Sequence, residues 1–206
     1  GLPWHAGFPL FKAIHMASSS EHTTEHMHLG PNSADKLFLA FLVLIVVAVT
    51  WLGVVNYREA LKVEAAKING EAWVAWLTET GTTRFEADTK HAACKGGIKA
   101  PADAKADTPG TWGACLAYIL AKTELKDQVN TFFNKAPHFV AACDPKDRTL
   151  MGAILLEDLM PTPPGSATPF VASQLLETDS VDYKMQLRLS VCDKGGAAIK
   201  VAEFEF

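Results

Sequence analysis

What this 206-residue sequence has little of argues against several classes of protein. It carries 19 Lys and Arg against 23 Asp and Glu, so the formal net charge is −4, without the basic excess that marks nucleic-acid binders. Hydrophobic residues make up 49% of the chain, too many for a disordered polymer. No segment recurs with a period of about 20–50 residues, as solenoids and propellers require. We expect one domain with an appendage, and no nucleic-acid partner.

Motifs of catalytic and cofactor-binding sites are also missing. The sequence has no GxSxG, no HExxH, no phosphate-cradling glycine loop and no GxGxxG before a helix. We interpret Glu157 and Asp158, after a predicted strand, as solvated turn residues. His91 lies in a polar stretch and is expected to be exposed, and His138 to be a partly buried loop residue. We therefore expect no enzyme, no cofactor and no small-molecule substrate.

The dominant feature is the apolar run at residues 37–55, which holds no charged residue and whose only polar side chain is Thr50. At about 1.5 Å per residue, a helix of this length reaches close to 30 Å, the hydrocarbon thickness of a bilayer. Trp51 and Tyr57 lie near its second end, where aromatic residues favour the interface. A signal peptide would be shorter, and a core helix is rarely apolar all round. The run predicts a helix that spans a lipid bilayer.

The helix is predicted to extend well beyond the span. Gly30-Pro31 interrupts the chain before it, and Asn32 or Ser33 can cap the helix, with Asp35 in the first turn. Residues 57–77 are amphipathic, and their apolar stripe is expected to cover the sheet of the head. This stripe contains Tyr57, Leu61, Ala65, Ile68, Ala72 and Trp76. We predict one helix at residues 33–78, between an N-terminal segment at 1–32 and a head at 79–206.

All four cysteines, Cys94, Cys115, Cys143 and Cys192, follow the predicted span. An even number in an exported domain predicts two disulfides, of which three connectivities are possible. Pairing of neighbours along the chain is preferred. The alternative is reduced cysteines in a cytoplasmic domain, with or without zinc, although no CxxC and no Cys-His pair at zinc-ligand spacing occurs.

The cysteines indicate more strongly than the basic residues on which side of the membrane the C-terminal head lies. Lys12 and Lys36 precede the span, whereas Arg58, Lys62 and Lys67 follow it closely, so the positive-inside rule mildly favours a cytoplasmic head. The two indications disagree, and the disulfides carry more weight. We predict a single-pass protein whose C-terminal head is periplasmic or extracellular.

The head is predicted to be α+β. Residues 111–121 predict a helix, and 124–133 extend it or form a second. Residues 149–156 form a buried strand, and the proline-rich stretch 161–166 is a non-helical connection. Residues 183–191 and 198–206 alternate around Gly195-Gly196, which predicts a β-hairpin. The resulting fold class is a long helix packed on a small antiparallel sheet with two disulfides.

The N-terminal segment is the least ordinary part of the sequence. Its short apolar stretch at residues 4–16 is suited to a membrane interface or a partner. Beyond it, His22 and His26 would share one face of a helix, with His28 nearby, so the three form a candidate divalent-metal site. A polar tether is the alternative, because short histidine-rich tracts bind metals adventitiously.

This organisation resembles that of type IV pilins and pseudopilins. The helix at residues 37–77 corresponds to their stalk, residues 151–156, 183–191 and 198–206 to their antiparallel sheet, and Cys143–Cys192 to the disulfide that closes their C-terminal region. The nearest glycine before the apolar run, Gly30, precedes a proline, and the run holds no glutamate. The processing signal and the glutamate register of pilins are therefore not carried over. The resemblance implies a subunit that assembles through its apolar helix.

Three functions are consistent with the sequence. The first is a non-enzymatic structural subunit of a filament or membrane-embedded assembly, which contacts copies of itself or other membrane subunits through residues 37–77. The second is a single-span accessory subunit of a larger membrane complex, and the third is an extracytoplasmic sensor or binding head. Helix-packing residues are expected in both parts of the helix: Phe38, Phe41, Ile45, Ala48, Leu52, Leu61, Ile68 and Trp76.

Overall fold

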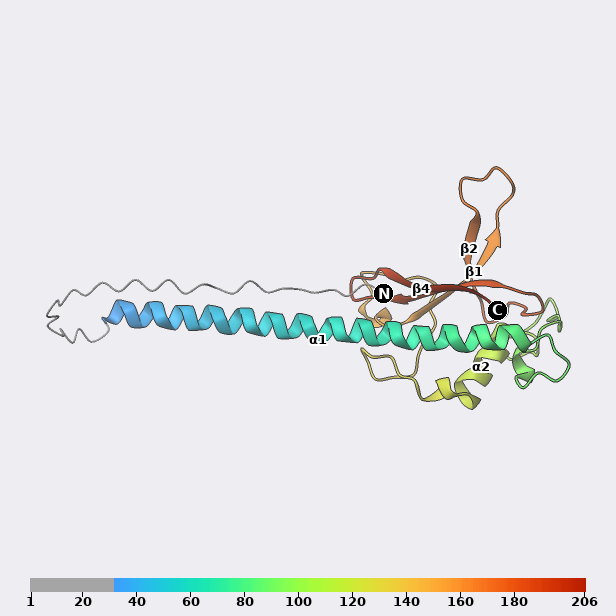
Figure 1. Cartoon of the computed structure of the whole chain (residues 1–206), viewed down its shortest axis with the longest axis horizontal. Coiled ribbons are helices and arrows are strands. Elements are labelled where there is room, and N and C mark those ends of the chain that lie inside the picture. Colours follow the sequence, from blue (N-terminus) through green and yellow to red (C-terminus); the bar gives the residue numbers. More distant parts are fainter. Residues whose placement is uncertain (1–31) are drawn as a thin grey trace, which may run out of the picture. The chain divides into compact units, whose positions relative to one another are not determined.

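The computed structural model describes residues 32–206, and the candidate metal ligands His22, His26 and His28 lie outside this range. Helices and strands follow the order α1 (Ser33–Thr83), α2 (Trp112–Lys122), β1 (Ile154–Pro161), β2 (Phe170–Gln174), β3 (Gln186–Cys192) and β4 (Ala198–Glu205), as Figure 1 shows. Short 3-10 turns occur at Ala92–Cys94, Glu124–Asp127 and Arg148–Leu150. The chain divides into two compact units, with the boundary between Ala48 and Val49 inside α1.

Helix α1 begins where the sequence places its cap. The side chain of Asn32 accepts a hydrogen bond from the backbone N–H of Ser33 at 3.1 Å, and Asp35 Oδ2 accepts one from the N–H of Asn32 at 3.2 Å. The carboxylate of Asp35 thus lies at the positive end of the helix dipole. The helix ends at Thr83, five residues later than predicted, with Gly81 inside its last turn.

The head, within residues 49–206, contains an antiparallel sheet in the order β2-β1-β3-β4. Strands β3 and β4 confirm the predicted hairpin, with a register shift between Leu189 and Ser190. β1 runs on through Glu157 and Asp158, so the interpretation of these two residues as a solvated turn is wrong. β2 was not predicted; it pairs with the outer half of β1 and forms a hairpin that stands away from the rest of the head (Figure 1).

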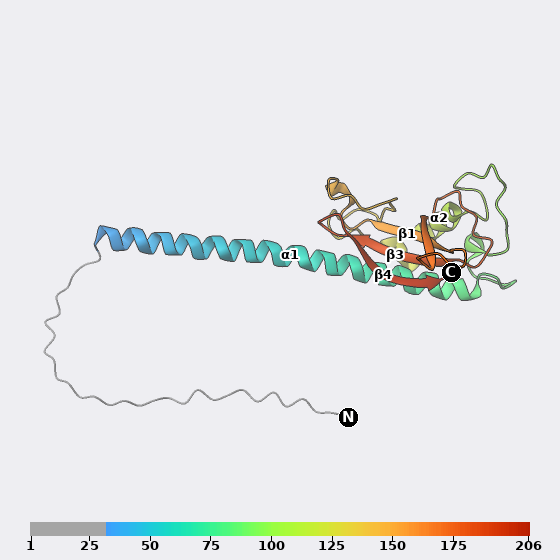
Figure 2. The ribbon, with the colours of Figure 1, turned by 90° about the horizontal axis from the view of Figure 1, so that it is seen from above.

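Helix α1 packs on β3 and β4 along the stripe Ala66, Gly70, Trp73 and Leu77, all buried. Figures 1 and 2 both show the second half of α1 running beside these strands. Gly70 permits this close approach, because a Cβ there would lie 3.0–3.2 Å from side chains of β3 and β4.

The predicted stripe is displaced around the helix from the face that covers the sheet. Tyr57, Leu61 and Ile68 are exposed, and of the predicted set only Trp76 is buried. The expectation that Leu61 and Ile68 cover the sheet is therefore wrong, and these two apolar side chains are left on the surface of the head.

Two disulfides connect the remaining elements. Cys94 pairs with Cys115 in α2, and Cys143 pairs with Cys192 at the end of β3, which confirms the preferred pairing of neighbours along the chain.

The hydroxyl of Thr111 caps α2 by accepting a hydrogen bond from the N–H of Ala114 at 3.3 Å. The predicted second helix at 124–133 is only the 3-10 turn Glu124–Asp127.

Arg84 fixes the end of α1 to the end of the sheet. Its fully buried guanidinium donates to the carbonyl oxygens of Val181 (2.6 Å), Tyr183 and Phe206 (3.3 Å). The rings of Phe85 and Phe206 lie 4.7 and 4.2 Å from its Cζ. Desolvation lowers the pKa of Arg84 to about 10, against a favourable interaction with Asp182. Arg84 therefore joins three segments that are far apart in sequence.

Candidate assembly interface

The apolar part of α1 has no cover from the rest of the described chain. Its most apolar 18-residue window has a mean hydropathy of 2.9, with no residue buried. The predicted packing residues Phe38, Phe41, Ile45 and Leu52 are all exposed large side chains, and Ala48 is exposed as well. A run of exposed leucine, valine and phenylalanine on this scale is stable in water only if lipid or protein covers it.

A second apolar surface lies on the part of α1 that belongs to the head. The exposed stripe, defined here as Tyr57, Leu61 and Ile68, is 66%, 51% and 56% exposed. With about 100° per residue, these three side chains fall within about 40° of one another around the helix. The buried residues Ala66 and Gly70 lie on the opposite side. Helix α1 thus carries two apolar faces in the head, and the sheet covers only one of them.

The predicted packing residues do not share one face of the helix. Leu61 lies nine residues after Leu52, a rotation of about 180° around an α-helix. Leu52 is 61% exposed and Leu61 51%, so each offers apolar area to a different side. A single neighbouring helix cannot cover both residues at once.

Polar contacts hold α1 against the head beside the exposed stripe. Asn69 Nδ2 donates to the carbonyl oxygen of Val129 at 3.0 Å, and Thr131 Oγ1 donates to that of Lys62 at 2.8 Å. Glu59 forms an ion pair with Lys194, which precedes β4. These contacts involve helix residues 59–69, and the orientation of the stripe relative to the head is therefore fixed by two side chains and one backbone carbonyl of the helix.

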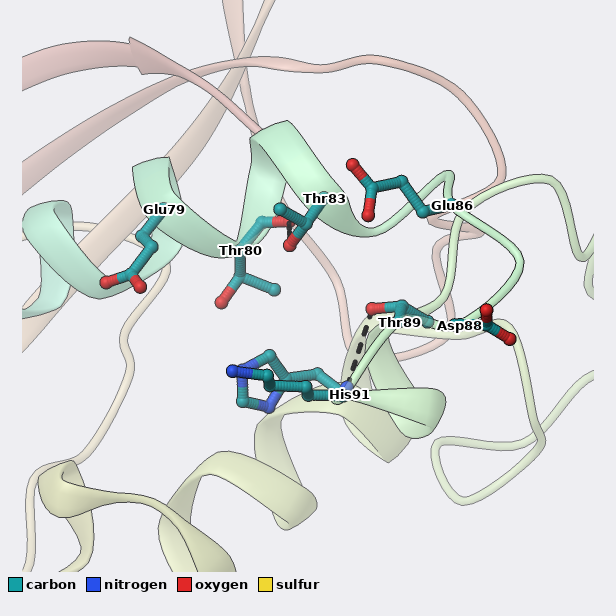
Figure 3. Close-up of a pocket in the computed structure, with 8 residues that line it drawn as sticks. Glu79, Thr80, Thr83, Glu86, Asp88, Thr89 and His91 are labelled. Carbon is teal, nitrogen blue, oxygen red and sulfur yellow. Dashed lines mark hydrogen bonds between the residues drawn. The ribbon is translucent and has the colours of Figure 1, made fainter.

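A small polar pocket lies at the C-terminal end of α1, and Figure 3 shows its lining residues. The cavity measures about 150 Å³ and is lined by Glu79, Thr80, Thr83, Glu86, Asp88, Thr89, Lys90 and His91. In residues 32–206, no group of three or more His, Cys, Asp or Glu side chains is arranged to hold a metal ion. The pocket thus presents carboxylates and threonine hydroxyls without a metal-ligating set.

His91 lines this pocket and is not the exposed residue that its polar surroundings predict. Its ring packs edge-on against Trp76 and Tyr118, at centroid distances of 5.1 and 5.7 Å, and its Nδ1 lies 3.2 Å from Tyr118 Oη. The backbone N–H of His91 donates to Thr89 Oγ1 at 3.4 Å (Figure 3). The ring therefore joins α1 to α2. His138 is half-buried in a loop, as predicted.

Asp158, a buried acid of β1, forms a hydrogen bond between two segments of the head. Asp158 is 6% exposed and accepts a hydrogen bond from the Tyr183 hydroxyl at 2.7 Å. Burial raises the pKa of Tyr183 well above its usual value of 10.0, and the hydrogen bond and the charge of Asp158 add to this effect. The pair joins β1 to the segment before β3.

Comparisons with protein-family models, curated proteins and solved structures give no match to this chain. Its class follows from the structure alone. The chain is an α+β protein with two disulfides, in which one helix near the N-terminus is long and apolar enough to cross a membrane. This architecture is compatible with that of a pilin-like subunit.

Proposed function

We propose that this protein is a non-enzymatic structural subunit of a pilus-like filament or membrane-embedded assembly. Residues 37–55 would anchor it in the lipid bilayer as a single span, and the head would lie in the periplasm or outside the cell. Two disulfides support an oxidising compartment for the head, because such bonds are rare in the cytosol.

The observation that carries this proposal is the pair of uncovered apolar surfaces on α1. A membrane anchor alone explains the apolar run, but it gives no reason for Tyr57, Leu61 and Ile68 to be exposed on the head. Lipid or protein can cover the apolar run, but the exposed stripe lies outside the bilayer and needs a protein neighbour. Side-by-side packing of many copies supplies this neighbour and also covers the opposite side at Leu52, because each helix then offers a different face to the copy on either side.

The proposal is tested by cysteine crosslinking of the full chain in its native membrane. Ile68→Cys places a thiol on the exposed stripe, and Leu52→Cys places one in the apolar run on the opposite side of α1. Lys62→Cys, an exposed position about 120° from Ile68, serves as the control. A bismaleimide joins two thiols, so each single variant should give dimers at positions 68 and 52 but not at position 62. The double variant Leu52→Cys/Ile68→Cys, with two thiols per chain, should give ladders of higher multimers.

A charge within the apolar run gives an independent test. Ile45→Lys should abolish assembly and leave the head folded, whereas Ile45→Leu should assemble normally. Ladders that persist in Ile45→Lys would contradict the proposal. Crosslinks only to unrelated proteins would instead identify an accessory subunit of a larger membrane complex.

A further inference from the structure

Strand β2 has an edge to which nothing in the described chain bonds. It is the outermost strand of the sheet and pairs only with β1. Leu175 N–H donates to the carbonyl oxygen of Leu156, and Thr162 N–H donates to that of Pro169. Backbone groups alternate in direction along a strand, so these two bonds show that the N–H and C=O groups of Val171 and Ser173 point toward β1. The N–H and C=O groups of Phe170, Ala172 and Gln174 therefore point away from the sheet.

This edge lacks the devices that usually protect an exposed strand. Its sequence from Phe170 to Gln174 has no charge and no proline, and every residue except Ser173 is exposed. Val171 is 53% exposed, and its neighbour across the hairpin, Met160, is 48% exposed. Soluble proteins normally place lysine, proline or a bulge on such an edge to prevent pairing.

The opposite edge strand of the same sheet shows the contrast. β4 carries Lys200, Glu203 and Glu205, and ion pairs join two of them to neighbours on the β3 side: Glu203 to Arg188 and Glu205 to Lys184. Charges therefore protect one edge of the sheet and are absent from the other. The β1–β2 hairpin also projects from the head, so β2 is accessible to another strand (Figure 1).

We propose that β2 pairs with β2 of a second copy of this protein, in an antiparallel arrangement with a two-fold axis at Ala172. In this register Ala172 opposes Ala172, and Phe170 opposes Gln174 on both sides of the axis. Each pair contains only outward-facing backbone groups, so all three pairs are of the hydrogen-bonded type and exchange roughly six hydrogen bonds. The two heads then share one continuous sheet.

The sequence of β2 favours a second copy of this chain as its partner. A strand without charge meets its own copy with no like charges opposed, whereas self-pairing of β4 would bring charged side chains together. The arrangement is isologous and therefore closes at a dimer, which prevents the open-ended growth that an unprotected edge otherwise risks. It goes beyond the proposed function, because it uses no residue of α1.

Crosslinking of the full chain in detergent micelles tests the register. The Cα atoms of a hydrogen-bonded antiparallel pair lie about 5.5 Å apart, within the range that a disulfide spans. Ala172→Cys should therefore oxidise to a dimer. Ser166→Cys, in the exposed turn of the same hairpin, should not, because the two turns lie at opposite ends of the paired strands. Equal crosslinking at both positions, or none at position 172, would overturn the proposal.

A charge introduced at the contact provides the second test. Ala172→Lys places two ammonium groups opposite each other, and Ala172→Gln adds similar length without charge. By native mass spectrometry, the lysine variant should weaken the dimer about fivefold or more, and the glutamine variant should stay close to wild type. Equal dimerisation of the two variants, or a crosslink from position 172 only to a different protein, would contradict self-pairing.

These outcomes are separable from those of the proposed function. The crosslink at position 172 should persist in the Ile45→Lys background, in which helix assembly is lost. A head that dimerises through β2 without any assembly through α1 would contradict the proposed function alone, and the converse result would contradict the β2 pairing alone.

Discussion

Arg84 holds the end of α1 to the rest of the head, and its removal should be costly. Arg84→Met keeps much of the side-chain length but removes all three hydrogen bonds to the carbonyl oxygens of Val181, Tyr183 and Phe206. Hydrogen bonds from a charged donor contribute about 1.5–3 kcal/mol each, so the bonds together account for roughly 4–9 kcal/mol.

The net loss is smaller than this sum, because a buried charge is itself unfavourable. Desolvation of the guanidinium, which lowers the pKa of Arg84 to about 10, offsets several kcal/mol of the hydrogen-bond energy. We expect Arg84→Met to lower the free energy of unfolding by about 3 kcal/mol. At about 2–4 °C per kcal/mol for a chain of this size, Tm should fall by roughly 10 °C.

Near-UV circular dichroism of the full chain in detergent reports this loss, because Trp73 and Trp112 are buried in the head. Arg148→Met, a substitution of an exposed arginine, is the matched control and should leave Tm within about 2 °C of wild type. Arg84→Lys keeps the charge but not the planar fork and should recover less than half of the loss. An unchanged Tm in Arg84→Met would refute the role of this residue.

Three further variants test other contacts. Gly81→Ala should destabilise the head by about 2 kcal/mol or more in denaturant titrations, because its Cβ would lie 2.8 Å from the backbone of Phe206, whereas Gly53→Ala, with no atom within 4 Å, should not. Replacement of the Cys143–Cys192 disulfide by two serines should cost about 4 kcal/mol, as expected for a separation of 49 residues, and an unchanged denaturation midpoint would contradict this estimate. Tyr183→Phe should cost about 1–3 kcal/mol below pH 9. Because the pKa of Tyr183 is raised in the folded state, the unfolded chain loses this proton first as pH rises above 10, and the advantage of wild type over Tyr183→Phe should shrink there. A constant difference would refute the hydrogen bond to Asp158.

The elements that the sequence predicts are those with a strong local pattern. These patterns depend on neighbours along the chain. The structure confirms a helix through the uncharged run at 37–55, a strand at Gln186–Cys192 in place of the predicted 183–191, and the capped start of α1. The preferred disulfide pairing is also confirmed, although the sequence left three connectivities open.

The packing face of α1 could not be predicted, because the helix has two apolar stripes in the head. Periodicity identifies Leu61 and Ile68 as one stripe and does not show which stripe the sheet covers. Gly70 lies on the correct face, where side chains of β3 and β4 approach the helix. Gly53 lies in the same helix with no atom within 4 Å, so a glycine alone does not identify the buried side from the sequence.

Other features depend on contacts between distant segments. β2 has no clean alternation and follows a proline-rich connection, and it becomes a strand only by pairing with β1. Arg84 and Val181 are 97 residues apart in sequence, and His91 meets Tyr118 across 27 residues. No local pattern marks these residues. The role of Arg84 was therefore not predicted, and His91 was predicted to be exposed.

The central claim is that many copies of this chain pack side by side through the apolar run and the exposed stripe of α1. Crosslinking mass spectrometry on the native membrane, with thiols at both positions 52 and 68 of each chain, tests it most directly. We predict links from each position to other copies of the same chain, in ladders beyond the dimer. Links from both positions only to unrelated proteins, with one copy of this chain per particle, would contradict the account.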